Sequence, residues 1–186
     1  MPQEMVAPDT QEIGGTVDDF RLTAIGGGVV GLQTLLEGKN GAVVVFWSSV
    51  CSHCTRYDNY LSGFASLHPD LGLAAIASRQ EETAAALRAA AAARALLFPI
   101  LHDPTGSVAK KWFTHQTPRV FLIDSNRVLR YRGAIDNYRY PNDLEYMAYL
   151  EPAIAQFLAG KPLTRTEAAS FGCAIRSIYY DLPKAL

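Results

Sequence analysis

Hydrophobic residues in this chain form short uninterrupted runs, and stretches with helical spacing lie between them. The clearest run is residues 43–47, Val-Val-Val-Phe-Trp, whose β-branched and aromatic side chains predict a fully buried strand. After it, apolar side chains recur at the i, i+3, i+4 and i+7 positions of a helix. These are Tyr57, Tyr60, Leu61 and Phe64. The turn between this strand and this helix contains Cys51-Ser52-His53-Cys54.

The rest of the pattern predicts alternating strands and helices. Strands are expected at residues 19–23 (an edge strand), 29–30, 71–77, 98–101, 119–124 and 128–132. Helices are expected at residues 32–36, 83–97, 107–113 and 144–158. Ser78 and Glu81 resemble a capping box ahead of the alanine-rich helix. This alternation predicts a single α/β domain.

The two ends of the chain lack such a pattern. Residues 1–12 are polar and contain two prolines, which predicts a mobile lead-in. The domain is expected over residues 13–160, because Gly160 ends the last helix. Residues 161–186 show no clear period, and they are expected either to form a tail packed on or near the domain or to hang free.

Composition narrows the class of protein. A chain of 186 residues suits one domain with a sizeable core, and a net charge of −1 gives no reason to expect nucleic acid or a membrane surface as partner. No run of about 18 apolar residues predicts a membrane-spanning segment. Residues 1–11 lack the order of a signal peptide, so a cytoplasmic protein is expected, or a periplasmic one if a leader has been removed.

The cysteine pair is the strongest chemical signal. At the start of a helix, unpaired N–H groups and the helix dipole stabilise a thiolate, so Cys51 is predicted to be the nucleophile and the more exposed sulfur. Cys54 would resolve the mixed disulfide that exchange creates. Protonated His53 would favour the Cys51 thiolate and an oxidising couple, or His53 is an exposed turn residue with little influence.

Other roles for the pair are weaker. A loop this short gives a structural disulfide little chain entropy. A zinc site would need a second pair of ligands, and a c-type haem would need histidine where Thr55 stands. The other histidines show no ligand spacing, so we expect neither a metal nor another cofactor.

Three matches place the cysteines in a larger pattern: Phe46-Trp47, Cys51-x-x-Cys54, and Thr117-Pro118 before residues 120–124. With them the chain resembles the thioredoxin-like superfamily over about residues 13–160. Residues 15–36 are similar to the front of its redoxin branch, which contains the AhpC/TSA, TlpA/ResA-like and peroxiredoxin-like proteins.

The resemblance implies a central mixed β-sheet flanked by helices, with an N-terminal β-hairpin extension and a C-terminal tail. It implies a redox-active dithiol and a cis Thr117-Pro118 bond that faces Cys51. The Thr117 backbone would then be free to pair with an extended substrate, and Trp47, Thr117 and Pro118 would form the substrate-binding surface. Without the family match, a trans proline that starts a strand would be the favoured interpretation.

Two departures from thioredoxin stand beside these matches. Val45 occupies the place of its buried acid, and Val50 occupies the place of a tryptophan. The chain also matches part of a peroxiredoxin site, since Ser48-x-x-Cys51 has the hydroxyl-to-cysteine spacing without the preceding proline. Arg56 or Arg119 would then supply the cation, although each is also expected as a solvated surface residue.

The third cysteine lies in the tail. The sequence Gly172-Cys173-Ala174-Ile175-Arg176 is similar to a Gly-Cys-x-Ile-Lys/Arg ending in a peroxiredoxin-like branch that carries Cys-x-x-Cys. Cys173 is therefore either a third redox thiol, which meets Cys51 or Cys54 when the tail folds back, or a small buried hydrophobe.

The predicted function is that of a thiol–disulfide oxidoreductase with a role in cell redox homeostasis. It would act on a protein or small-molecule disulfide or dithiol and use an unidentified electron donor. The alternative is an antioxidant thiol peroxidase, with Cys51 peroxidatic and Cys54 or Cys173 resolving. A non-catalytic binding module ranks below both, and the oligomeric state stays open.

Overall fold

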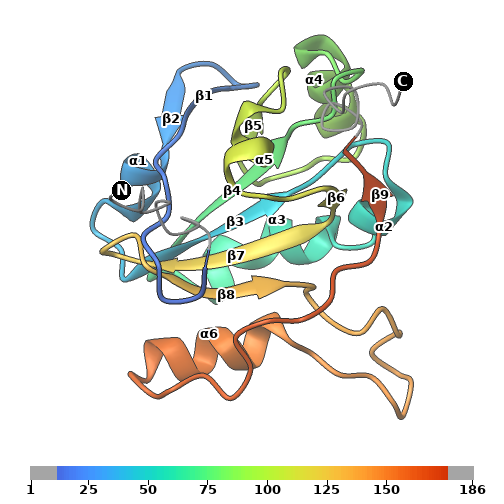
Figure 1. The fold of residues 1–186 in the computed structure, drawn as a ribbon. Helices are drawn as coiled ribbons and strands as arrows, with labels where there is room; N and C mark the ends of the chain where they lie inside the picture. Colours follow the sequence, from blue (N-terminus) through green and yellow to red (C-terminus); the bar gives the residue numbers. More distant parts are fainter. Residues whose placement is uncertain (1–11, 176–186) are drawn as a thin grey trace, which may run out of the picture.

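A seven-stranded mixed sheet organises the computed structural model, which describes residues 12–175 (Figure 1). Its strands are β1 (Arg21–Ala24), β2 (Val29–Gly31), β3 (Gly41–Phe46), β4 (Leu71–Ala77), β5 (Ile100–His102), β7 (Arg119–Asp124) and β8 (Leu129–Gly133). Their order across the sheet is β2-β1-β5-β4-β3-β7-β8. The neighbours β3, β4 and β5 are parallel, whereas β7 runs antiparallel to both β3 and β8.

Six helices and a small second sheet complete the described part of the chain. The helices are α1 (Leu32–Leu36), α2 (Ser52–Thr55), α3 (Asp58–Leu67), α4 (Ala84–Ala93), α5 (Ser107–Lys111) and α6 (Leu150–Leu158). The second sheet pairs β6 (Gln116–Thr117) with β9 (Cys173–Ala174). The predicted thioredoxin-like fold, with a central mixed sheet, flanking helices and an N-terminal hairpin, is confirmed. None of the helices in residues 12–175 has the length and apolar character needed to cross a membrane.

Strand β3 is apolar throughout because both faces of the sheet are covered. Val43 and Val45 point into a core that α3, α4 and α6 close, and Val44 and Phe46 point into a second core that α1 and α5 close. All six residues of β3 are buried. The cysteines follow the end of this strand, so the site is attached to a fully buried inner strand of the sheet.

Strand β1 corrects the predicted edge position of residues 19–23. It pairs with β2 on one side and with β5 on the other, where Thr23 lies opposite His102. The edge strands of the large sheet in the described residues are β2 and β8. Local alternation identifies a half-buried strand, but it does not identify the strands on either side of it.

Three helices differ from their predicted bounds. The helix after the cysteines is broken into α2 and α3 around Tyr57. Helix α4 is capped by Thr83, whose hydroxyl accepts the N–H of Ala86 at 3.1 Å, so the predicted capping box of Ser78 and Glu81 is wrong. Helix α6 begins at Leu150, and Pro152 is tolerated because it lies in the first turn.

The chain after α6 returns along β8 toward the cysteines (Figure 1). The N–H of Arg132 donates to the carbonyl of Thr166 at 3.0 Å, and the N–H of Ala168 donates to the carbonyl of Arg132 at 3.1 Å. Gly133 has φ +142, and a Cβ there would lie 2.1 Å from the carbonyl oxygen of Ala168. Glycine therefore allows this close approach. Residues 1–11 of the lead-in predicted over residues 1–12, and the chain beyond residue 175, lie outside the described residues.

Candidate active site

The two sulfurs of the Cys-x-x-Cys sequence stand where β3 passes into α2. Cys51 is the N-cap of α2, with φ −93 and ψ 113, and Cys54 lies one turn into the helix. The Cys51 sulfur lies 3.5 Å from the Thr117 carbonyl oxygen, to which the thiol donates a hydrogen bond when it is protonated. The Thr117-Pro118 peptide bond is cis. The structure thus brings together Cys51, Cys54, Thr117 and Pro118, and their catalytic roles stay predictions.

The pKa values of the two thiols are shifted in opposite directions. The pKa of Cys51 is lowered to about 4, chiefly by a hydrogen bond from Cys54. Hydrogen bonds from Cys173 and Thr117 lower it further, and together these bonds outweigh burial, which raises it. Burial raises the pKa of Cys54 well above its usual range, and the neighbouring Cys51 adds to this effect. At neutral pH the pair therefore holds a Cys51 thiolate and a Cys54 thiol.

The exposure of the sulfurs differs from the prediction. Cys51 and Cys54 are both 0% exposed, so Cys51 is not the more accessible sulfur of the pair. Cys173 is half-buried. The reason is the C-terminal segment, because β9 lies antiparallel to β6 with Cys173 opposite Thr117. The same pairing occupies the Thr117 backbone, which was predicted to be free for an extended substrate.

His53 lies between the loop after β8 and the C-terminal segment. Its half-buried ring makes edge contacts with Tyr138 and Phe171, with ring centroids 5.7 Å and 5.5 Å away. These contacts fix where the imidazole stands beside the cysteine turn. Its influence on the redox couple stays a prediction.

Trp47 corrects a predicted role. Its side chain is 0% exposed, so it offers no surface to a substrate. The indole N–H donates to Asp58 at 3.2 Å, and the guanidinium of Arg94 lies 5.3 Å from the ring centroid and 3.3 Å from Asp58. Trp47 therefore supports the site from the core below it.

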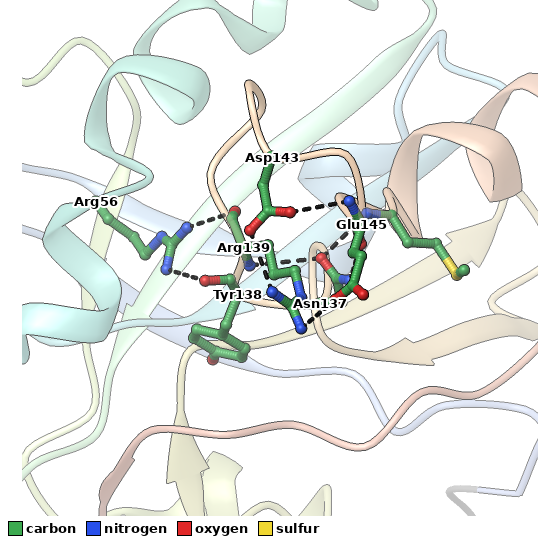
Figure 2. A network of polar contacts seen from close by, with 7 residues as sticks. Arg56, Asn137, Tyr138, Arg139, Asp143 and Glu145 are labelled. Atoms are coloured by element: carbon green, nitrogen blue, oxygen red, sulfur yellow. Dashed lines mark hydrogen bonds and ion pairs between the residues drawn. The ribbon is translucent and has the colours of Figure 1, made fainter.

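Neither of the two arginines that a peroxidase site would need is among the main groups that act on Cys51. Arg56 donates to the carbonyls of Tyr138 and Arg139, both at 2.9 Å, and so holds the loop after β8 (Figure 2). Arg119 is half-buried on β7, where burial is the main cause that lowers its pKa and the nearby charges are those of Arg132 and Glu167. No arginine in residues 12–175 is among the main groups that act on the Cys51 sulfur.

The loop held by Arg56 is a polar network of its own. Arg139 pairs with Asp143 and Glu145, and Asn137 accepts the N–H of Met147 at 3.0 Å (Figure 2). The network positions Tyr138, whose ring contacts His53. This loop is therefore a wall of the site, and nothing in its sequence period indicated that role.

Glu82 is another part of the site that the sequence pattern did not indicate. It is 4% exposed, and its Oε1 accepts the N–H of Ser49 at 2.7 Å and the hydroxyl of Ser49 at 2.5 Å. The carboxylate thereby holds the turn that precedes Cys51. Ser48 in the same turn is 1% exposed, and its hydroxyl accepts the N–H of Val50 at 3.4 Å.

Comparison with known proteins places this geometry in a family. The model of the AhpC/TSA family matches residues 13–132. A hypothetical protein from Sinorhizobium meliloti 1021 is 30% identical, with 89% of this chain and 94% of that chain covered and a TM-score of 0.78. No curated protein matches.

Two more distant structures share the fold. Peroxidoxin BcpB from Mycobacterium tuberculosis is 20% identical over 80% of this chain and 97% of its own, with a TM-score of 0.63. A structure described as thiol:disulfide interchange protein DsbE from Chlorobium tepidum is 18% identical over 80% of this chain and 96% of its own, also with a TM-score of 0.63.

Proposed function

Because the chain belongs to the AhpC/TSA family of thioredoxin-like redoxins, we propose that it is a thiol–disulfide oxidoreductase whose nucleophile is Cys51. The observation that carries the proposal is the Cys51 sulfur itself. It stands at the start of a helix, receives hydrogen bonds from two thiols, and lies 3.5 Å from the carbonyl oxygen of the residue before a cis-proline. A thiolate held in this way is the reactive form in disulfide exchange.

The exchange has two steps. The Cys51 thiolate attacks one sulfur of a substrate disulfide, and the other sulfur leaves as a thiolate and takes a proton. Cys54 then loses its proton and attacks the Cys51 sulfur, which releases the reduced substrate and leaves a Cys51–Cys54 disulfide. In the mixed disulfide Cys51 has no charge, so one cause that raises the pKa of Cys54 is gone.

The couple is expected to be oxidising. Any interaction that stabilises the Cys51 thiolate stabilises the reduced protein, and so raises the reduction potential. The protein would then pass its disulfide to a dithiol, and a separate thiol–disulfide partner would restore it. The peroxidase alternative is disfavoured because Arg56 is bound to two backbone carbonyls, and neither Arg56 nor Arg119 is among the main groups that shift the pKa of Cys51.

A glutathione titration tests the function. In a Cys173→Ser background we expect one reversible disulfide, between Cys51 and Cys54, as the ratio of oxidised to reduced glutathione rises. Acid quenching, alkylation and peptide mapping would identify it. Adding Cys54→Ser to this background should leave Cys51 as a mixed disulfide with glutathione, whereas adding Cys51→Ser should leave no disulfide. A pair that stays reduced across the whole range would refute the proposal.

His53 supplies a smaller test. We expect His53→Gln, which keeps the backbone N–H and removes the ionisable ring, to lower the reduction potential by a measurable amount of up to about 30 mV, where 30 mV corresponds to about 1.4 kcal/mol. The expected shift is small because Cys54, Cys173 and Thr117 are the groups that lower the pKa of Cys51 most. Equilibration with glutathione measures it. A potential that stays constant or rises would contradict a tuning role.

A further inference from the structure

The C-terminal segment is seated in the site by contacts on both sides of Cys173. The N–H of Ile175 donates to the carbonyl of His115 at 2.8 Å, and the Ile175 side chain is 1% exposed in the core on the α1 and α5 face of the sheet. On the other side, the amide of Gln116 donates to the carbonyl of Ser170. Residues 170–175, which we call the covering segment, are therefore held against the site at both ends.

Gly172 is the point of closest approach. A Cβ at this position would lie 1.8 Å from the carbonyl oxygen of Thr117 and 3.1 Å from Cδ of Pro118. Any residue other than glycine would force the covering segment away from the cis-proline. The glycine before Cys173 thus allows this cysteine to reach the reactive sulfur.

The covering segment changes which sulfur meets solvent. Cys51 and Cys54 are 0% exposed beneath it, whereas Cys173 is half-buried and donates a hydrogen bond to the Cys51 sulfur. Of the three cysteines, Cys173 is therefore the one that meets solvent. It is thus the cysteine of the three that an external thiol can approach most readily.

We propose, on the basis of the function proposed above, that Cys173 relays the disulfide between the buried Cys51–Cys54 pair and an external dithiol. In the oxidised protein the Cys173 thiolate attacks the Cys51 sulfur, the Cys51–Cys173 bond forms, and Cys54 leaves and takes a proton. A thiolate of the external dithiol attacks the Cys173 sulfur, and Cys51 leaves as a thiolate. The second thiol of the substrate, after losing its proton, displaces Cys173. The substrate is oxidised by two electrons and the protein ends with three reduced cysteines.

The charges in the site favour Cys173 as the nucleophile of the first step and Cys51 as the leaving group of the second. In the reduced protein, burial is the main cause that raises the pKa of Cys173 to about 11, and the hydrogen bond and charge of Cys51 add to it. Those two contributions end when Cys51 enters a disulfide, while Arg79 and the backbone N–H of His53 still favour a Cys173 thiolate. Cys51 is the better leaving group in the second step, because thiols of low pKa leave faster.

The first test traps the relay intermediate. Cys54→Ser, treated with one equivalent of oxidised glutathione, should form a Cys51–Cys173 disulfide that peptide mapping identifies after acid quenching. Cys54→Ser/Gly172→Ala should instead stop at a mixed disulfide of Cys51 with glutathione, because the added Cβ displaces the covering segment. Gly26→Ala in the Cys54→Ser background is the matched control, since a Cβ at Gly26 meets nothing within 4 Å, and it should still form the Cys51–Cys173 bond.

The second test measures the relay as a rate. Reduction of the oxidised protein by dithiothreitol should be about tenfold slower in Cys173→Ser than in the wild type, because both remaining sulfurs are buried. Cys173→Ala should be slowed equally, which guards against an effect of the serine. Wild-type rates in both variants, together with no Cys51–Cys173 bond in Cys54→Ser, would overturn the relay. The Cys51–Cys54 disulfide would still form in Cys173→Ser in that case, so the function proposed above would stand.

Discussion

The reduced protein is expected to gain stability over a Cys51→Ser variant as the pH rises from about 4 to about 9. The pKa of Cys51 is lowered from 9.0 to about 4 in the folded chain, chiefly by the hydrogen bond from Cys54. A lowered folded pKa stabilises the fold fully above the unfolded pKa, and this contribution is lost as the pH falls through the folded one. At pH 7, three units above 4, the contribution is on the order of 4 kcal/mol.

Two other thiols lower the free energy of unfolding of the reduced protein at high pH. Cys54 and Cys173 have raised pKa values, chiefly because they are buried, so their contributions are present below pH 9 and are lost as the pH rises further. Both thiols are present in the wild type and in Cys51→Ser, so the stability difference between the two reduced proteins should grow through the acid and neutral range and level off near pH 9, the unfolded pKa of Cys51.

Urea unfolding between pH 4.5 and pH 8, with reductant present, measures this difference. The carboxylates titrate alike in both proteins, so subtracting the two curves isolates Cys51. A matched control is Ser52→Ala, which changes an exposed residue of the same turn and should follow the wild type. Parallel curves for wild type and Cys51→Ser would mean that Cys51 is not held as a thiolate.

The chemistry of the cysteine turn was predictable because its determinants are local. A buried apolar run, a turn and a helical repeat follow one another within about 20 residues, and helix N-termini stabilise anions through their free N–H groups. The cis form of Thr117-Pro118 is different, since no local pattern requires it. It followed from the family resemblance alone.

The cover over the site was not predictable in the same way. Cys173 pairs with Thr117, which lies 56 residues earlier in the sequence. The strand that carries Cys173 has only two residues, too few to show a periodic pattern. Pairing of this kind depends on where α6 and β8 direct the chain. For the same reason the sequence pointed to Cys51 as the accessible sulfur, whereas the fold makes Cys173 the accessible one.

Trp47 and Glu82 show a second limit. An aromatic residue at the end of a buried strand predicts either a core side chain or a wall of the site, and only the contact with Asp58 decides between them. Glu82 lies in a polar stretch that predicts a loop, yet its carboxylate is buried beneath Ser49. A buried acid is identified by its partners, and these come from a distant turn.

Reduced protein is expected to react with a small disulfide in preference to hydrogen peroxide. At pH 5 an ordinary thiol is about 0.03% ionised, whereas Cys51 is almost wholly a thiolate. Its weaker intrinsic nucleophilicity costs about two powers of ten, which leaves an advantage of about tenfold or more at pH 5 once the sulfur is uncovered, as in Gly172→Ala, and a rate that hardly changes up to pH 8.

Peroxide needs more than a thiolate, because the departing oxygen must be stabilised as its bond breaks. The guanidinium of Arg56 is bound to backbone carbonyls and does not serve as the cation. Ser48 is buried, and its hydroxyl accepts the N–H of Val50. We therefore expect peroxide rates only modestly above those of ordinary thiolates, and little change in Ser48→Ala. Stopped-flow tryptophan fluorescence on wild type and Gly172→Ala, with both oxidants, gives the ratio of the two rates independently of access. A ratio that favours peroxide and collapses in Ser48→Ala would make the thiol peroxidase the better assignment.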